Sequence, residues 1–293
     1  MRLLDVAYPL LTAAAEWCPI DQESTYGFLL REVTREERIE HHSVRGRAKV
    51  AYIHPRLPAA LADLSVEDVI VQVNTVDVAG KSVDEVGRLI ERLTRAKIQP
   101  LQLEIVRGGT SRTIMMSAVP ACHYAMRVLH TDLINGITDG RQIGVTRGAL
   151  QFFVSDDELG WVVAHEIAHN LLSHVQNMKL QAILGTFIAA RGEESGSTVT
   201  MPPRPSLESQ ADYVGAYLMA RAGYDLSAIT RVWERLERLE SRQPGQRRGL
   251  ALTHPPTKER RVAFEVTLRE IETKRRLGLP FDIQRNDQGG AQQ

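Results

Sequence analysis

Two histidines and a glutamate stand in a His-Glu-x-x-His pattern at residues 165–169. Apolar residues recur every three or four positions around this pattern, which predicts a helix from Asp156 to about Met178. On such a helix His165 and His169 lie one turn apart, so both imidazoles can reach one cation from the same side. Glu166 is rotated away about the helix axis, where its carboxylate suits a base that acts on water at the metal. The alternative is a helix with two surface histidines.

A catalytic zinc site usually has three protein ligands, so a third residue is needed. His174 follows His169 by five residues without a glycine to turn the chain, and we expect it on the helix surface or beside the ligands. Glu208 is a better candidate because it opens a second predicted helix 39 residues after His169. Asp212 shares the helix face of Glu208 and could accept a hydrogen bond from the outer nitrogen of a ligating histidine. The alternative is a solvated face with two acidic residues.

The composition is that of a globular chain without a strong bias. The chain has 293 residues, 43% of them hydrophobic, with 36 basic against 36 acidic side chains. These values argue against a disordered or fibrous protein and against nucleic acid as the main partner. The longest stretch without Asp, Glu, Lys or Arg, Thr113–Met126, is too short for a transmembrane segment. We expect Met1–Ala15 to be an amphipathic helix, so the targeting segment of an exported protein would lie outside this sequence.

Residues 41–118 form a region of predicted strands with one clear helix, which begins with a capping box at Ser82. The strands, with the turn between the last two, are Ala48–Ile53, Val69–Val73, Leu101–Val106, Gly108-Gly109 and Thr113–Ser117. The region resembles a bacterial PDZ domain, although Asp63, Glu67 and Thr75 stand where such domains usually have turn glycines. The resemblance implies a peptide or C-terminal ligand added at a sheet edge. A packing module with a closed groove is the alternative.

After Pro120 the pattern changes to helices. Besides a short strand at Gln142–Val145, the predicted elements are the helices Asp156–Met178, Glu208–Ala222, Asp225–Glu240 and Pro256–Arg276. Gly192–Pro205 is rich in Gly, Ser and Pro and is predicted to be a loop. Residues 285–293 are polar, and we expect a disordered tail there.

The residues of the predicted metal site, with two further segments, are similar to those of one protease family. His-Glu-x-x-His followed by Glu-x-x-Ala-Asp at 208–212 looks like the gluzincin arrangement of metallopeptidase family 48, the family of HtpX and the CAAX prenyl endopeptidases. The pattern resembles in particular the soluble, periplasmic BepA-like branch of this family. Family members also have a strand that runs into a short apolar segment, here 139–150, and His-Pro-Pro followed by an arginine, here 254–256 with Arg260. The resemblance covers residues 120–275 and the helix at the start.

This resemblance implies a fold and a domain order. We expect an α+β protein in which a mainly helical, zincin-like metalloprotease domain has a small β-sheet and an inserted, β-rich PDZ-like domain. The expected divisions are 1–40 for the N-terminal part of the peptidase domain, 41–118 for the insert, 119–284 for the zinc metallopeptidase domain and 285–293 for the tail. Cys18 and Cys122, on either side of the insert, could form a disulfide in an oxidising compartment. Two unrelated buried thiols are the alternative.

The resemblance also assigns roles to single residues. The zinc ligands that it implies, for one ion per chain, are His165, His169 and Glu208. Glu166 would be the general base. His254 would face the reacting carbonyl and stabilise the developing oxyanion, or else it precedes the last helix for structural reasons. Arg260 would hold that helix in place through an ion pair.

The function expected from these roles is that of a zinc-dependent endopeptidase. It would hydrolyse peptide bonds of protein substrates with a metal-activated water, in envelope protein quality control. The substrate backbone would add as a strand to Gln142, Ile143, Gly144 and Val145. The expected location is periplasmic or otherwise extracytoplasmic, with the cytoplasm left open. The alternatives are a catalytically latent, PDZ-centred adaptor or chaperone that uses the metal domain as a scaffold, and a metal-dependent hydrolase of esters or small amides. Gly192–Pro205 could cover the cleft of a latent protease.

Overall fold

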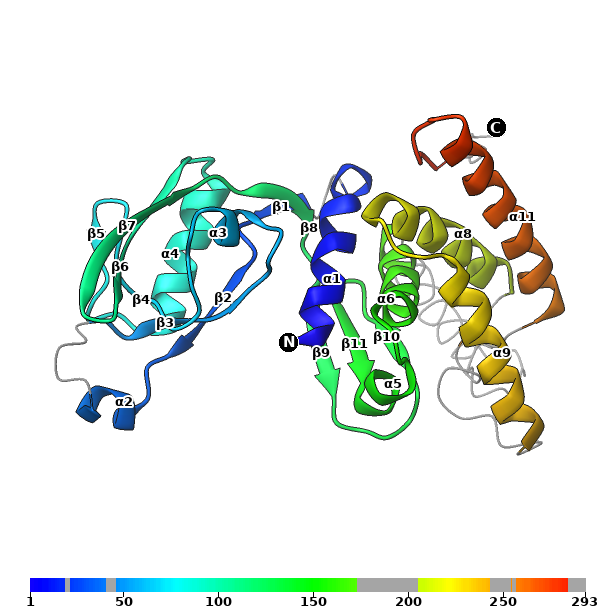
Figure 1. The fold of residues 1–293 in the computed structure, drawn as a ribbon, viewed down its shortest axis with the longest axis horizontal. Coiled ribbons are helices and arrows are strands. Elements are labelled where there is room, and N and C mark those ends of the chain that lie inside the picture. The colour runs from blue at the N-terminus through cyan, green and yellow to red at the C-terminus, as the bar shows by residue number, and fades with distance from the viewer. Residues whose placement is uncertain (19–21, 41–45, 173–204, 243–253, 255–256, 284–293) are drawn as a thin grey trace, which may run out of the picture. The chain divides into compact units, whose positions relative to one another are not determined.

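A computed structural model of the chain describes residues 1–18, 22–40, 46–172, 205–242, 254 and 257–283 (Figure 1). Several predicted features lie outside the described residues. They are His174, the end of the helix predicted to reach Met178, the predicted loop up to residue 204, and the predicted tail 285–293. Among the described helices, none combines the length and the apolar character that a membrane crossing needs.

The chain divides into two compact units, which are described separately. The first consists of Met1, Leu3–Tyr8 and Cys18–His123. The second consists of Arg2, Pro9–Trp17 and Tyr124–Gln293. Helix α1 (Arg2–Ala13), followed by a short 3-10 helix at Ala15–Trp17, contributes residues to both units.

The first unit is built on a six-stranded antiparallel sheet, in the order β2-β3-β4-β6-β7 with β5 beside β4. Its strands are β2 (Phe28–Glu32), β3 (Ala48–Ile53), β4 (Val69–Val73), β5 (Val76–Asp77), β6 (Leu101–Arg107) and β7 (Thr110–Met116). A separate pair is formed by β1 (Gln22–Thr25) and β8 (Val119–Cys122). The strands predicted from the sequence are therefore confirmed.

Helix α4 (Val83–Arg95) packs its apolar face on this sheet. Its capping box is complete, since the Ser82 hydroxyl accepts from the backbone N–H of Glu85 and the Glu85 carboxylate accepts from that of Ser82. Val86 and Ile90 are buried in the core of the unit. Two shorter helices are α2 (Arg35–Glu40) and α3 (Pro58–Leu61).

The first unit begins before residue 41, which differs from the predicted boundary. Residues 22–32 form β1 and β2, and β2 pairs with β3 at the end of the sheet. The assignment of 1–40 to the peptidase domain missed both strands: β1 pairs with the distant β8, and β2 pairs with β3, which lies inside the predicted insert. Of the three residues that replace turn glycines, Asp63 (φ 64°) and Glu67 (φ 79°) adopt left-handed conformations, whereas Thr75 does not.

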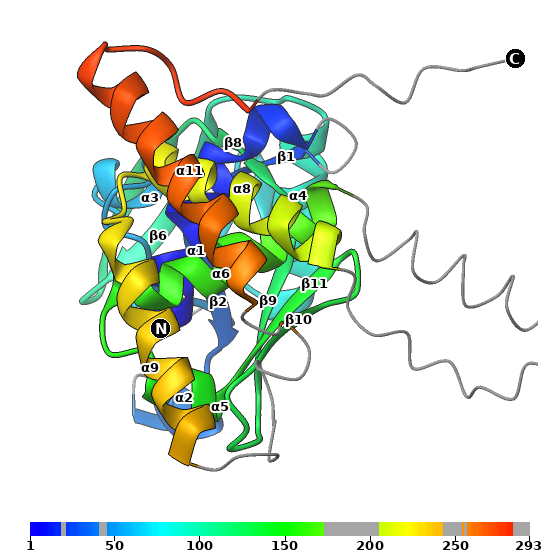
Figure 2. The same cartoon turned by 90° about the vertical axis from the view of Figure 1, so that its right-hand side faces the viewer.

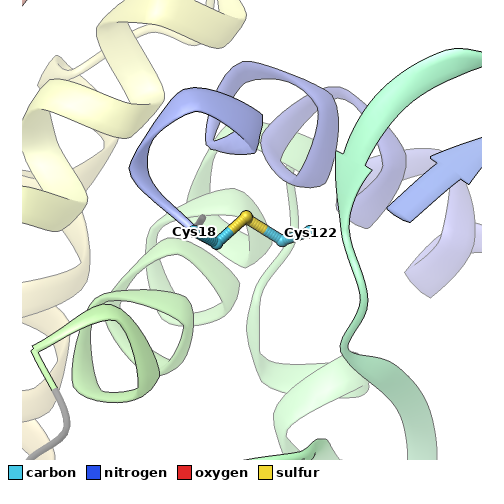
Figure 3. Close-up of a disulfide and its surroundings, with 2 residues drawn as sticks. All are labelled: Cys18 and Cys122. Carbon is cyan, nitrogen blue, oxygen red and sulfur yellow. A yellow bond between two sulfur atoms is a disulfide. The ribbon is translucent and has the colours of Figure 1, made fainter. Parts of the chain in front are cut away.

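Cys18 and Cys122 form a disulfide in the first unit (Figure 3). Their Cα atoms lie 5.9 Å apart, although the residues are separated by 104 positions in the sequence. The disulfide that the resemblance implied is thus present. Both cysteines stand next to the points where the chain passes from one unit to the other, after Trp17 and after His123.

The second unit combines helices with a three-stranded sheet (Figure 2). The strand order is β10-β11-β9, with β11 antiparallel to β10 and parallel to β9. The strands are β9 (Ala125–Leu129), β10 (Gly136–Thr138) and β11 (Gln142–Thr146), and the helices are α5 (Arg147–Phe152), α6 (Asp156–Leu171), α8 (Pro205–Ala222), α9 (Ser227–Arg242) and α11 (Lys258–Arg276). Together with the strands of the first unit, this is the expected α+β class.

Helix α6 is the centre of the second unit. The Ser155 hydroxyl caps its first turn by accepting from the backbone N–H of Glu158. From Glu158 to Asn170 every residue is buried, so the helix is covered on all sides. Gly215 of α8 allows a close approach, because a Cβ there would lie 3.3 Å from the backbone nitrogen of His165. The two helices that bear the predicted ligands are therefore held in direct contact.

Candidate metal centre

Four side chains in the second unit converge on one point. Their potential metal-binding atoms all lie within 4.8 Å of one another, and the residues are His165, His169, Glu208 and His254. The two histidines of the His-Glu-x-x-His pattern come from α6, and Glu208 comes from α8. His254 precedes α11. The first three are buried, and the side chain of His254 is 11% exposed.

The spacing of the three predicted ligands fits a zinc ion. Nε2 of His165 lies 3.0 Å from Nε2 of His169 and 3.3 Å from Oε2 of Glu208. Nε2 of His169 lies 3.5 Å from Oε1 of Glu208. Tetrahedral zinc with bonds of about 2.0–2.1 Å keeps its ligand atoms about 3.3 Å apart. The three groups could therefore hold the ion nearly where they stand.

The tautomer of His165 also favours a cation. Its Nδ1 lies 3.1 Å from Oδ1 of Asp212, and this carboxylate favours a proton on Nδ1. In the neutral ring, Nε2 then carries a lone pair, and this lone pair faces a second ring nitrogen and a carboxylate oxygen. Such a group of electron-rich atoms needs a proton or a metal ion between them.

Asp212 is itself held by Arg260. Nε and Nη2 of Arg260 each donate a hydrogen bond of 2.8 Å to the Asp212 carboxylate. Arg260 is 1% exposed, and its guanidinium carbon lies 5.6 Å from the centre of the Trp233 ring. The structure brings Asp212 to the ligating histidine and ties α11 to α8 through Arg260, as the sequence predicts. The functional role of Asp212 stays a prediction.

Burial and pairing shift the pKa values of these groups in the protein without metal. Burial alone would lower the pKa of His165, but hydrogen bonds to Asp212 and Glu208 outweigh it and raise the pKa to about 9. Burial alone would raise the pKa of Glu208, but its hydrogen bonds to His165 and His254 hold it well below the usual range. Asp212 follows the same logic, with hydrogen bonds from His165 and Arg260 lowering its pKa against the effect of burial.

Glu166 lies beside the cluster and is not part of it. Burial raises the pKa of its carboxyl above the usual value, because the side chain is removed from water. Its Oε1 lies 3.3 Å from Nε2 of His254. A carboxylate with a raised pKa next to a metal site suits the role of a general base.

His254 comes closer to the ligand atoms than its predicted role requires. Its Nδ1 lies 2.8 Å from Oε2 of Glu208 and 3.2 Å from Nε2 of His165. The ring therefore stands among the ligands, with its other nitrogen towards Glu166. Stabilisation of an oxyanion by His254 stays a prediction.

The prediction of which strand binds the substrate backbone is wrong. Residues Gln142, Ile143, Gly144 and Val145 belong to β11, the central strand, which pairs with β10 on one side and β9 on the other. A strand paired on both sides has no free row of backbone donors and acceptors. The strand at the edge beside α6 is β10, whose Gly136 approaches so closely that a Cβ would lie 3.1 Å from Oε1 of Glu166.

A local signal could have located β10. Asp139-Gly140 lies between two short apolar stretches, and Gly140 adopts a φ of 96°. Asp-Gly between such stretches indicates a hairpin turn, which places a strand before it as well as after it. The strand that follows the turn was predicted, and its partner was missed.

Comparison with known proteins identifies the family. The family model described as Peptidase family M48 matches residues 111–266, which is more than half of the chain. This chain belongs to Peptidase family M48. The family that the motifs predicted is therefore confirmed. A metal-dependent peptidase family agrees with the convergence of two histidines and a glutamate on α6 and α8.

Three relatives carry the name mitochondrial metalloendopeptidase OMA1. The chain is 28% identical to that of Schizosaccharomyces pombe over 177 residues, which are 56% of this chain and 52% of the relative. It is 33% identical to that of Arabidopsis thaliana over 129 residues, which are 41% of this chain and 26% of the relative. The protein of Saccharomyces cerevisiae is 27% identical over 115 residues, 36% of this chain and 33% of its own length. The chain thus spans about half or less of the length of these relatives.

Solved structures match part of the chain at low scores. A PDZ domain of HtrA3 bound to a phage-derived ligand has 19% identity and a TM-score of 0.29, over 34% of this chain and 88% of that one. The HtrA-type protease AlgW with a decapeptide has 18% identity and a TM-score of 0.27, over 34% of this chain and 30% of that one.

Proposed function

We propose that this M48 protein is a zinc-dependent endopeptidase that hydrolyses peptide bonds of protein substrates. The observation that carries the proposal is the convergence of His165, His169 and Glu208 at the spacing of a zinc site, with the buried carboxylate of Glu166 beside it. Two neutral imidazoles and one carboxylate leave a divalent ion with a net charge of +1. Such a site can polarise a carbonyl group.

The residues of the chain divide the work of the reaction. A bound zinc ion would supply Lewis acidity towards the carbonyl oxygen and make water more acidic. Glu166 takes the proton of the attacking water and later gives it to the amine that leaves. Burial raises the pKa of Glu166 towards neutral pH. A carboxylate with such a pKa can both take the proton from water and give it to the leaving amine. Asp212 fixes the ring of His165, and Arg260 fixes Asp212.

We assign the substrate backbone to the outer edge of β10 (Gly136–Thr138). This strand ends the sheet on the side of α6, and its outer edge has no strand partner among the described residues. A substrate added there would run past Glu166, which Gly136 approaches closely. Recognition would rest on main-chain hydrogen bonds, so sequence selectivity would be modest.

A second binding site for peptides is assigned to the first unit. A groove of about 930 Å³ runs between β2 and α4, with Phe28, Leu30 and Ile90 among its lining residues. β2 is the last strand of its sheet in the described residues, so it offers a free edge beside the groove. An extended peptide or a C-terminal segment fits this combination of edge and apolar lining.

The position of His254 favours one alternative, a latent protein. With His254 in place, four protein groups surround the metal position, and four protein ligands are typical of closed, structural zinc sites. A protein in this state could act as an adaptor or chaperone through its first unit. Removal of the ring in His254→Ala distinguishes the two functions, since it should raise the activity of a latent protein and lower that of an enzyme that needs His254.

The proposed location is an oxidising compartment outside the cytoplasm, where the protein would serve protein quality control. The disulfide between Cys18 and Cys122 supports this, because such bonds persist in oxidising compartments. The relatives named above are mitochondrial by name.

A protein-substrate assay with chelator tests the proposed function. Casein-like substrates should be cleaved by the purified full chain, cleavage should stop with chelator, and added zinc should restore it. Cleavage that persists in chelator, or ester hydrolysis without peptide cleavage, would contradict an endopeptidase. Glu234→Gln on α9, where the side chain is 45% exposed, serves as the control for a charge change away from the site.

A further inference from the structure

The hydroxyl of Thr138, at the end of β10, lies within hydrogen-bond distance of two acceptors. Its Oγ1 is 2.8 Å from the carbonyl oxygen of Gln142 and 2.7 Å from Oδ1 of Asn170. A hydroxyl has one proton to donate, although it can accept twice, so it cannot donate to both oxygens. In one of the two contacts Thr138 must therefore be the acceptor.

The side-chain amide of Asn170 supplies the missing donor. Asn170 is 9% exposed, and its Nδ2 has no hydrogen-bond partner among the described residues. The oxygen and nitrogen of such an amide are assigned from the groups around them. With the two exchanged, the amide of Asn170 donates to Oγ1 of Thr138, and Thr138 donates to the carbonyl of Gln142. These hydrogen bonds join α6 to the turn between β10 and β11.

The same strand is also fixed to α6 at its other end. Asn170 directly follows His169 on α6, so the hydrogen bond to Thr138 starts beside a predicted ligand. At Gly136 a Cβ would lie 2.7 Å from Cγ1 of Val162 and 3.1 Å from Oε1 of Glu166. Close packing at Gly136 and a hydrogen bond at Thr138 thus hold β10 against the helix that carries the general base.

We propose that Asn170, acting through Thr138, is a positioning residue that sets the edge strand β10 relative to Glu166. This inference rests on the proposed function, in which the substrate backbone adds to β10. A substrate bound to the strand moves with it, so the distance from the scissile carbonyl to the Glu166 carboxylate follows the placement of β10. A misplacement of about 1 Å can lower a rate about 10²-fold. Without the hydrogen bond, the substrate still adds to the strand but is poorly aligned.

The variants Thr138→Val and Asn170→Ala test this role with a peptide long enough to pair with β10. Each should lower kcat about tenfold or more while KM stays within about twofold, because binding to the strand is kept and alignment is lost. The double variant should be no slower than Thr138→Val, because that change already breaks the contact that Asn170→Ala removes. Zinc content and thermal midpoint should stay at the wild-type values, and Thr138→Ser should recover kcat because it keeps a hydroxyl.

The matched control is Thr113→Val, which removes a strand hydroxyl that donates to Glu104 in the first unit. Its kcat should equal that of the wild type. The positioning role is wrong if Asn170→Ala keeps kcat, if KM rises at constant kcat, or if the two single losses add in the double variant. A loss of zinc or of folded protein that explains the whole fall in kcat also contradicts it.

Glu166→Gln separates this failure from a failure of the proposed function. Hydrolysis that survives Glu166→Gln overturns the proposed function itself. Hydrolysis that requires Glu166 but is indifferent to Asn170 overturns only the positioning role.

Discussion

Two edge strands, β2 in the first unit and β10 in the second, offer the same backbone feature in different surroundings. β2 lines a groove with α4, and the side chains around it are apolar or solvated. β10 lies on α6, where Gly136 meets the carboxylate of the buried Glu166. A free edge is enough to bind a peptide, but hydrolysis also needs buried polar groups that converge beside the edge.

Two ion pairs, one from each unit, differ in the same way. In the first unit, Arg95 and Glu23 pair at 2.7 Å with side chains 60% and 26% exposed. In the second, Arg260 and Asp212 pair with side chains only 1% and 3% exposed. Exposed pairs contribute little, whereas removal of one partner from a buried pair leaves a charge without compensation. The pair at the metal site is therefore the one whose loss should matter.

The largest difference between the two edges is expected from Glu166→Gln. Loss of a general base should lower kcat/KM about 10²–10⁴-fold. Zinc content and peptide binding in the β2–α4 groove should be unchanged, because neither uses this carboxylate. The measurement is steady-state hydrolysis together with elemental analysis. Wild-type turnover in this variant would remove Glu166 from the mechanism.

The disulfide belongs to the first unit, so its removal should act there. For a loop closed over 104 residues, the variant with both Cys18→Ser and Cys122→Ser should lose about 2–4 kcal/mol in the free energy of unfolding of the first unit. Zinc content should be kept, since the ligands lie in the second unit. Denaturant titration of oxidised and reduced wild type gives the same comparison. Identical unfolding curves with and without the disulfide would contradict the expectation.

Alanine substitutions at two glycines should affect the two edge strands differently, because each added Cβ meets a different neighbour. Gly136→Ala places a Cβ 2.7 Å from Cγ1 of Val162, an overpacking that should cost about 1–3 kcal/mol and impair hydrolysis while peptide binding in the groove persists. Gly27→Ala places a Cβ against Leu57 at a φ of 78° and should impair groove binding while hydrolysis of a short peptide persists. Gly80→Ala, which meets no atom within 4 Å, is the control. Equal effects of Gly136→Ala and Gly27→Ala on both readouts would erase the distinction between the edges.

The smallest step, about tenfold for one pH unit, is expected in the pH dependence of zinc affinity. In the protein without metal, the pKa of His165 is raised to about 9, and the protonated ring must lose its proton before it binds zinc. Affinity should therefore fall as the pH decreases below about 9, by about tenfold per pH unit for one proton. Asp212→Asn should weaken this dependence between pH 7 and 9. Competition with a chromophoric chelator measures it, and a pH-independent affinity in the wild type would contradict the pairing.

Local patterns in the sequence predicted most of what this account needs. The capping box at Ser82 and the one-turn spacing of His165 and His169 depend on residues within one helix, so each can be recognised where it stands. The identity of Glu208 as the third group came from its motif with Asp212 and from the resemblance to a family. The family is confirmed, and the geometry brings the three groups together.

What the sequence did not predict depends on which elements pair with one another. β2 belongs to the first unit because it pairs with β3, across residues that have no strand pattern. β11 is central because both β9 and β10 pair with it. The pattern of polar and apolar residues within β11 cannot reveal these partners. The contact of Thr138 with Asn170 joins residues 32 positions apart. Such contacts follow from the assembled fold, so periodicity alone does not specify them.

The zinc content of Glu208→Ala tests the central claim most directly. The claim is that two imidazoles of α6 and the carboxylate of α8 hold one ion between them. Wild-type protein should contain one zinc per chain after dialysis, as should the control Glu234→Ala on α9. Glu208→Ala should lose its zinc while both units stay folded. A full zinc complement in Glu208→Ala, held with wild-type affinity, would contradict the account.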